Sequence, residues 1–236
     1  MQVIPVVDLR GGVAVRAIAG RRAAYRPLVS PLAASSRPAE VVACYLRLYP
    51  FEAVYLADLD AIEGTGVNRD TIASLAAAFP QTRFWVDAGA RDAAAARDWL
   101  ASAPVDCVVG SETLGSAEAL RDLAREPRVI LSLDFRGDEF LGPPALLQTP
   151  QLWPERVVVM TLARVGAQAG PDAERLAALK ALAPKRRYYP AGGVRDGADL
   201  DALRATGAAG VLVATALHYG RLTRDDLARH NEKRGR

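Results

Sequence analysis

The sequence predicts a (β/α)8 barrel, a closed ring of eight strands each followed by a helix, with residues 1–236 as a single domain. Three observations support this: eight short apolar runs, helical patterns between them, and a repeat relating the two halves of the chain. The runs are rich in Val, Ile and Leu, as expected for parallel strands buried on both faces. They lie at residues 3–8, 53–58, 83–87, 106–110, 128–133, 156–161, 187–191 and 210–214. The active site of such a barrel lies at the C-terminal ends of its strands.

The first strand of this pattern occurs twice. The segment "VIPVVDLRGG" at 3–12 returns as "VILSLDFRGD" at 129–138, with five of ten positions identical. "FWVDAGARD" likewise matches "YYPAGGVRD" at an offset of 104 residues. The first pair has an offset of 126, because the segment after Asp8 is 22 residues longer than its counterpart. We therefore expect two half-barrels, at about 1–127 and 128–236, with the first and fifth strands opposite each other.

Several residues mark where helices should begin. Pro38 and Pro171 stand where a first helical residue is expected, because proline lacks the N–H that this position leaves unpaired. Asn68 and Asp196 stand where a side chain could cap exposed N–H groups. The fifth crossover, "GPPALLQTPQLWP", has the weakest helical pattern, so we expect the least regular helix there.

Composition is that of a globular protein, with 50% hydrophobic and 24% charged residues. The net charge of +3 comes from scattered arginines and a short tail, "NEKRGR", which does not predict a nucleic-acid partner. Cys44 and Cys107 have apolar neighbours and no paired spacing, which predicts buried, reduced thiols. No targeting segment and no membrane span is indicated. We expect a soluble cytoplasmic protein.

The repeated strands each end in an aspartate, Asp8 and Asp134. If the strands are opposed, the two carboxyl groups face one substrate from opposite sides of the barrel mouth. Such a pair can act as general base and general acid when the surroundings separate the two pKa values. The alternative is that each aspartate only caps a turn; the matched positions favour catalysis.

Small residues follow four of the predicted strands and suggest phosphate binding. Glycine turns let backbone N–H groups approach an anion closely, although such residues often serve only tight turns. Their symmetric arrangement predicts two phosphate sites on opposite sides of the mouth, so that the substrate could carry one phosphate or two. The residues concerned are Gly89, Arg91, Gly110 and Ser111 on one side, and Gly192, Gly193, Ala214 and Thr215 on the other.

The sequence lacks the residues that other common kinds of active site require. With only two histidines, His218 and His230, a histidine-rich metal site or a catalytic triad is not expected, and His218 is interpreted as a structural residue of a turn. Neither the GxxxxGK nor the GxGxxG nucleotide motif occurs. The long first loop carries four arginines that could form a lid over a phosphorylated substrate, or only a solvated surface: Arg16, Arg21, Arg22 and Arg26.

Nearly the whole chain resembles the histidine-biosynthesis (β/α)8 family, which comprises a ribotide isomerase and the cyclase subunit of imidazole glycerol phosphate synthase. "VIPVVDLRGGVAVR", "VYLADLDAIEGTGVN" and "SLDFRG" carry the resemblance, and "YLADLDAI" favours the isomerase. The resemblance implies an Amadori rearrangement of an aminoaldose phosphate to an aminoketose phosphate without a cofactor or metal. It implies Asp8 as the base at C2, Asp134 as the acid that opens the furanose ring, and Thr161 as a supporting residue. Phosphate would be held by Gly89 and Ser111 on one side and by Gly193 and Thr215 on the other.

Departures from the family pattern affect the residues that would hold the substrate. Asp87 and Ala90 stand in a turn where the isomerase has glycines, and a carboxylate there repels phosphate. Ala214 replaces another glycine, and Val165, Gly166 and Ala167 replace an acidic segment. The loop tryptophan is missing, although Trp153 could substitute for it.

This pattern is typical of a paralogue with a related reaction on another substrate. The chain also resembles isomerase-related proteins of methylotrophic bacteria that accompany tetrahydromethanopterin synthesis, whose precursors include a ribofuranosyl-aminobenzene phosphate. A catalytically silent barrel that binds a phosphorylated metabolite or a partner protein is the alternative outside the enzymes. A silent barrel would have no reason to keep both carboxylates, Asp8 and Asp134, so the enzyme is favoured.

Overall fold

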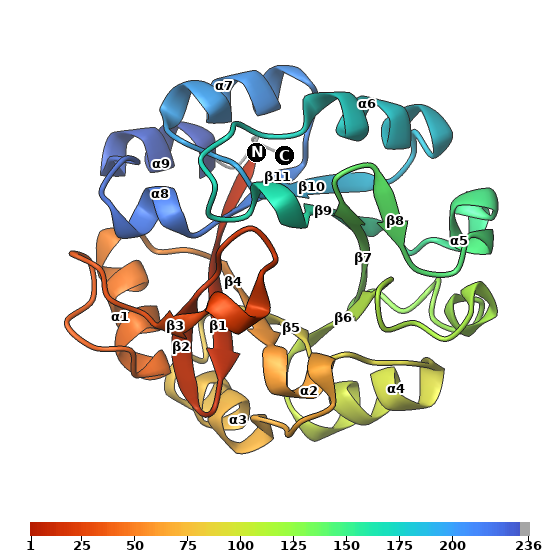
Figure 1. Ribbon diagram of the computed structural model, residues 1–236, viewed down its shortest axis with the longest axis horizontal. Coiled ribbons are helices and arrows are strands. Elements are labelled where there is room, and N and C mark those ends of the chain that lie inside the picture. The colour runs from red at the N-terminus through yellow and green to blue at the C-terminus, as the bar shows by residue number, and fades with distance from the viewer. Residues whose placement is uncertain (232–236) are drawn as a thin grey trace.

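Eight parallel strands form a closed barrel in the computed structural model, which describes residues 1–231, so that most of the basic tail lies outside the described residues (Figure 1). Each predicted apolar run forms one of these strands, and β11 pairs with β1 to close the ring. The fold class is therefore confirmed. In barrel order the strands are β1 (Gln2–Arg10), β4 (Ala53–Asp58), β5 (Arg83–Asp87), β6 (Asp106–Gly110), β7 (Val129–Arg136), β9 (Arg156–Thr161), β10 (Arg187–Ala191) and β11 (Gly210–Val213).

The two repeated strands run past their aspartates, which the sequence did not predict. β1 continues to Arg10 and turns back as β2 (Val13–Arg16), which pairs in turn with β3 (Arg26–Pro27). β7 turns back in the same way as β8 (Glu139–Leu141). The glycines of the repeated Arg-Gly segment make both turns possible, since Gly11 and Gly137 have φ of +57° and +60°. The matched hairpins support the two half-barrels, which we retain as a proposal.

Helices surround the strands on the outside of the barrel (Figure 1). The fourth crossover contains only a 3₁₀ helix and the fifth only one turn of α-helix and a 3₁₀ helix, so both are less regular than the others. Among the described residues, no helix has the length and hydropathy needed to cross a membrane. The α-helices are α1 (Pro38–Leu48), α2 (Leu59–Glu63), α3 (Arg69–Ala78), α4 (Ala93–Ser102), α5 (Ala145–Gln148), α6 (Ala173–Leu182), α7 (Gly197–Ala205), α8 (Thr215–His218) and α9 (Arg224–Asn231); the 3₁₀ helices are η1 (Arg22–Ala24), η2 (Ala117–Leu120), η3 (Pro150–Leu152) and η4 (Leu162–Arg164).

The predicted helix starts are partly confirmed. Pro38 is the first residue of α1, and the carboxylate of Asp196 accepts the N–H groups of the first turn of α7. Pro171 lies one residue before Asp172, which caps α6 instead. Asn68 precedes α3 without capping it, because its side chain is engaged elsewhere: the amide donates to the carboxylates at the start of α2.

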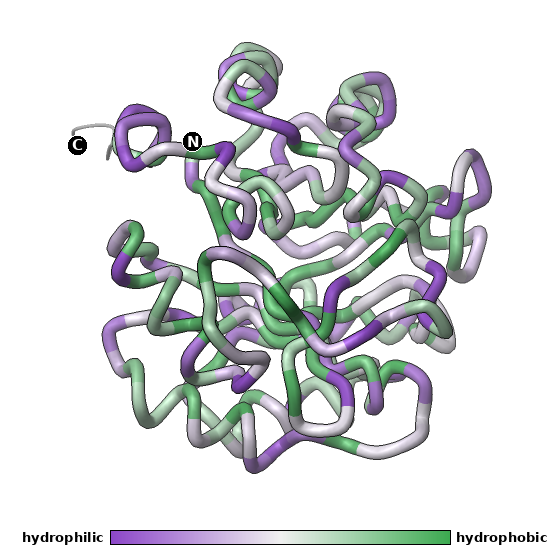
Figure 2. Tube along the Cα trace, turned by 60° about the vertical axis from the view of Figure 1, so that its left-hand side comes forward, coloured by the Kyte–Doolittle hydropathy of each residue, from purple (hydrophilic) through white to green (hydrophobic). Residues whose placement is uncertain are grey.

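The interior of the barrel is a packed core, with the hydrophobic strands at the centre of the molecule and hydrophilic residues mostly on the outer helices and loops (Figure 2). Trp85 and Tyr189 meet edge to face inside the ring, with ring centroids 4.9 Å apart. The Arg156 guanidinium stacks on Trp85 and lies 2.6 Å from the carboxylate of Asp106. Side chains of the described residues fill the barrel below the mouth, which leaves the C-terminal ends of the strands as the place for a ligand.

Candidate active site

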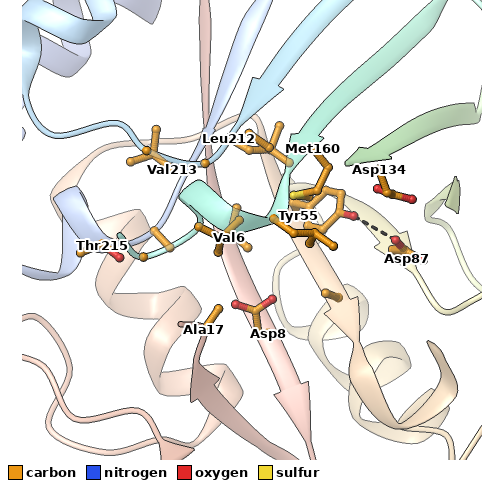
Figure 3. A pocket seen from close by; sticks show the side chains of 18 of the residues that line it. Val6, Asp8, Ala17, Tyr55, Asp87, Asp134, Met160, Leu212, Val213 and Thr215 are labelled. Carbon is orange, nitrogen blue, oxygen red and sulfur yellow. Dashed lines mark hydrogen bonds between the residues drawn. The ribbon is translucent and has the colours of Figure 1, made fainter. Parts of the chain in front are cut away.

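A cavity opens at the C-terminal ends of the barrel strands. Asp8 on β1 and Asp134 on β7 line it, and the two strands are four positions apart in the ring of eight. Figure 3 shows their carboxyl groups on opposite sides of the cavity, with Tyr55 between them. The arrangement is the one that the repeated strand-aspartate pattern predicts.

The Asp134 carboxyl group is buried and held by three hydrogen bonds. Its Oδ1 accepts the Ser132 hydroxyl at 2.6 Å, and its Oδ2 accepts the Glu112 N–H at 3.1 Å and the Ser111 hydroxyl at 3.2 Å. Burial nevertheless raises the pKa of Asp134 to about 7, and the negative charge of Asp87 contributes in the same direction. This carboxyl group can therefore hold a proton near neutral pH.

Asp8 has a different environment. It is partly exposed to the cavity, and its carboxylate makes no hydrogen bond with the described residues. Burial raises the pKa of Asp8 to about 7, while the nearby Arg22 guanidinium lowers it. A carboxylate with an elevated pKa and an unoccupied lone pair is suited to accept a proton from a bound molecule.

Asp87 lies in the same cavity beside Asp134, a neighbour that the sequence did not reveal. Its Oδ2 accepts the hydroxyl of Tyr55 at 3.1 Å, as Figure 3 shows, and its Oδ1 accepts the N–H of Gly89 at 3.2 Å. A Cβ atom at Gly110 would lie 3.3 Å from an oxygen of each carboxyl group, so a larger residue there would crowd the pair. Burial raises the pKa of Asp87 to about 6.

The predicted phosphate residues of the second half line the cavity: Gly192, Gly193, Ala214 and Thr215. Gly193 has φ of +92°, and a Cβ atom there would lie 2.0 Å from the carbonyl oxygen of Gly170. Glycine is thus required for packing of the neighbouring loop as well as for access to the backbone. No hydrogen bond among the described residues uses the backbone N–H of Gly193 or Thr215.

The predicted phosphate residues of the first half do not line the cavity. Gly89 packs against Ile62, Ser111 is fully buried, and Gly110 lies behind the two carboxyl groups. Arg91 is exposed on the outside of the turn. The structure therefore brings together only one of the two predicted phosphate sites with the aspartates.

Two further expectations do not fit the geometry. Thr161 lies outside the cavity, because side chains alternate along β9 and Met160 takes the inward position. The Thr161 hydroxyl instead donates to Asp172 at 3.3 Å. Trp153 is 1% exposed and its indole N–H donates to the carbonyl of Leu146, so it belongs to the core and does not cover a ligand.

The long first loop crosses the mouth of the barrel. Arg22 lines the cavity and forms ion pairs with Glu112 and with Glu63, so this arginine joins the first loop to two others. The loop also packs on the loop after β9, where the N–H of Ala19 donates to the carbonyl of Val165 at 2.7 Å. Among the four arginines of the predicted lid, Arg22 is the one that reaches the cavity.

His218 is buried on α8, where its ring bonds the Tyr45 hydroxyl at 2.7 Å and the Ser30 hydroxyl at 3.1 Å. Burial lowers the pKa of His218 to about 4, so the ring is neutral at pH 7. These contacts join α8 to α1 and to the first loop. Cys44 and Cys107 are buried free thiols, as predicted.

Comparison with known proteins identifies the family. A family model described as "Histidine biosynthesis protein" matches residues 2–223. A bis-phosphoribosyl imidazole-4-carboxamide isomerase of Myxococcus xanthus is 31% identical over 242 residues, covering 97% of this chain and 98% of the relative. The isomerase of the same name from Thermus thermophilus is 30% identical, covering 94% and 96%. An uncharacterized protein of Methanocaldococcus jannaschii is 29% identical, covering 96% and 97%. The chain therefore belongs to the histidine-biosynthesis protein family.

Proposed function

We propose that this protein is an isomerase that catalyses an Amadori rearrangement of a phosphorylated N-ribosyl amine and needs no cofactor. The observation that carries the proposal is the pair of carboxyl groups, Asp8 and Asp134, on opposite sides of one cavity. Membership of a family whose named relatives include isomerases supports it. We also retain the expectation of a cytoplasmic protein.

The two carboxyl groups have neighbours of opposite charge, which supports different roles for them. Burial raises both pKa values to about 7. Arg22 favours the ionised form of Asp8, whereas Asp87 favours the protonated form of Asp134. These neighbours support Asp8 as the general base and Asp134 as the general acid, the assignment that the family resemblance implies.

In the proposed reaction, Asp134 donates its proton to the furanose ring oxygen while the bond between that oxygen and C1 breaks. The amine nitrogen supplies the electron pair, and an open-chain iminium ion forms. Asp8 then takes the proton from C2, which gives an enolamine with a hydroxyl at C2. Tautomerisation of the enolamine yields the aminoketose, so atoms and electrons balance without an external oxidant or reductant. The phosphate of the sugar would bind the free N–H groups of Gly193 and Thr215.

The lining of the cavity favours a particular amine component. Beside the carboxyl groups it is mostly apolar, with Val6, Leu59, Met160, Leu162 and Val165 among its residues. No acidic segment follows β9, and Trp153 is part of the core. A phosphorylated N-ribosyl aminobenzene, an N-linked relative of the intermediate used in tetrahydromethanopterin synthesis whose nitrogen is bonded to C1 as the iminium step requires, suits such a lining better than a polar aminoimidazole.

The test is an assay of ketose formation from two substrates, the histidine-pathway ribotide and a ribosyl-aminobenzene phosphate. We expect turnover of the aminobenzene compound and poor turnover of the ribotide, since misplacing a reacting atom by about 1 Å costs on the order of 100-fold in rate. Asp8→Asn should abolish turnover and leave binding largely intact, because an amide cannot accept the C2 proton.

Each other outcome has a distinct meaning. Efficient ribotide turnover would assign the protein to histidine synthesis itself. No turnover of either compound by the wild type, together with retained phosphate binding, would favour the catalytically silent barrel. Full activity of Asp8→Asn would refute the assignment of Asp8 as the base.

A further inference from the structure

Two equivalent turns of the barrel differ in whether their backbone can receive an anion. The turn after β5 and the turn after β10 align at an offset of 104 residues, which makes Gly89 equivalent to Gly193 and Asp87 equivalent to Ala191. Both glycines have positive φ, +64° and +92°. The Gly89 N–H donates to the carboxylate of Asp87, whereas alanine at 191 offers the Gly193 N–H no such acceptor.

The backbone N–H groups of the neighbouring loop after β6 are occupied as well, and we call this side of the cavity the closed side. Every backbone N–H from Ser111 to Gly115 donates within the protein, to the carbonyls of Ser132, Gly110 and Arg91 and to the carboxylate of Asp134. The Ser111 hydroxyl is also engaged, with Asp134 and with the carbonyl of Leu141. Neither the amides nor this hydroxyl can bind an anion without first losing a partner.

The loop after β11 has the same backbone turn, but its first N–H, that of Thr215, is free within the described part of the chain. The N–H groups of Leu217 and His218 donate to the carbonyl of Ala214, just as those of Thr113 and Leu114 donate to the carbonyl of Gly110. The N–H of Thr215, equivalent to that of Ser111, has no partner among the described residues. In the loop after β6 the equivalent N–H, that of Ser111, donates to the carbonyl of Ser132, and the next one, that of Glu112, donates to the carboxylate of Asp134.

Charge separates the two sides further. Three carboxyl groups face the cavity on the closed side, those of Asp87, Glu112 and Asp134. Arg22, the arginine that lines the cavity, is engaged by Glu112 and Glu63. Arg83, which could have neutralised Asp87, instead lies 3.5 Å from Asp106. A phosphate on this side would meet carboxylates and no available guanidinium among the described residues.

We propose that the cavity takes a ligand with a single phosphate, bound on the Gly193 and Thr215 side, and that Asp87 reserves the opposite side for an uncharged group. This inference rests on the proposed function and narrows its substrate class. Hydroxyl or amine hydrogens of the ligand can donate to the carboxylate oxygens that face the cavity. The imidazole carboxamides named for relatives of this chain carry two phosphoribosyl groups, so the selectivity of this protein differs from theirs.

The test compares ribose 5-phosphate with ribulose 1,5-bisphosphate by isothermal titration calorimetry. For the wild type we expect the second phosphate to add no affinity, with dissociation constants within about threefold of each other. Asp87→Ala gives the turn after β5 the alanine that the turn after β10 has at Ala191, and it leaves the Gly89 N–H free. It should shift the ratio toward the bisphosphate by at least about tenfold, because it removes a buried like charge that opposes the second phosphate.

Two matched variants complete the experiment. Ala191→Asp introduces a carboxylate into the turn after β10 and should weaken binding of ribose 5-phosphate by at least about tenfold. Asp70→Asn changes an exposed aspartate on α3 and should leave both constants unchanged. Circular dichroism of each variant reports whether it is folded, and Asp87→Asn provides a nearly isosteric substitute if Asp87→Ala does not fold.

The outcomes separate this inference from the proposed function. Much tighter binding of the bisphosphate by the wild type, with a ratio that Asp87→Ala does not move, would overturn the single-phosphate assignment and leave the isomerase proposal standing. Absence of binding of either sugar phosphate would overturn both. Single-phosphate selectivity in a protein that shows no isomerisation would refute the proposed function alone.

Discussion

Asp8 and Asp134 face one cavity from opposite strands, and the charged groups beside them act in opposite directions. Arg22 lowers the pKa of Asp8, and Asp87 raises the pKa of Asp134, while burial raises both to about 7. Two carboxyl groups of the same chemistry thereby become suited to different roles at the same pH.

The pH dependence of kcat/KM tests this relationship. We expect a bell-shaped profile centred near pH 7, because Asp8 must be ionised and Asp134 protonated. Arg22→Ala removes the positive charge beside Asp8 and should move the acidic limb to higher pH. Asp87→Asn removes the negative charge beside Asp134 and should move the basic limb to lower pH. Because the two pKa values start close together, both variants lower the maximum of the profile; Arg22→Ala shifts this maximum to higher pH and Asp87→Asn shifts it to lower pH.

Arg26→Ala is the matched control for the first of these variants. Arg26 lies in the same loop, and within the described residues its guanidinium bonds only carbonyl oxygens of that loop. Its profile should coincide with that of the wild type. Parallel displacement of both limbs in either test variant would contradict the pairing of Arg22 with Asp8 and of Asp87 with Asp134.

Stability should also depend on Asp8. Burial raises its folded-state pKa to about 7 from 3.8, so the folded state binds the proton more tightly than the unfolded state. The resulting stabilisation is complete below about pH 4 and is lost as the pH rises through 7. Asp8→Asn has no charge to bury and should raise the free energy of unfolding at pH 8 by on the order of 2 kcal/mol, or Tm by roughly 5 °C.

Thermal unfolding at pH 8 and pH 4 measures this difference. The gain in Tm of Asp8→Asn over the wild type should disappear at pH 4, where both side chains are uncharged. Asp70→Asn, at an exposed position, should show no gain at either pH. A gain of equal size at both pH values would show that the effect comes from packing and not from the buried charge.

Substitution of Trp153 tests whether this residue belongs to the core or contacts the ligand. Trp153→Ala removes a fully buried side chain and should lower the free energy of unfolding by about 3–5 kcal/mol. The KM of the folded enzyme should change by less than about threefold, since the indole does not line the cavity. Urea unfolding and steady-state kinetics give the two values. A large rise in KM with little loss of stability would instead support the idea that Trp153 covers the substrate.

The sequence by itself determined the barrel, because eight separated runs of Val, Ile and Leu can be buried on both faces only in a parallel sheet covered by helices. The repeat also placed Asp8 and Asp134 on opposed strands. Inward and outward positions could not be assigned within such runs. The residues of "VVVMT" are all apolar or small, so the sequence does not show which side chains face the cavity. In the structure Met160 faces the cavity and Thr161 faces away from it.

Only the tertiary structure decided which groups share the cavity. Asp87 ends β5, and the position of Asp134 two strands away brings their carboxyl groups to the two sides of Gly110 on the strand between them. Tyr55 approaches Asp87 from the adjacent strand, and Arg22 arrives from a loop whose path no local pattern specifies. Each of these contacts joins residues far apart in the sequence. Barrel geometry sets their pairing. It also closes one phosphate site, because carboxylates lie where they occupy backbone N–H groups that could otherwise bind an anion.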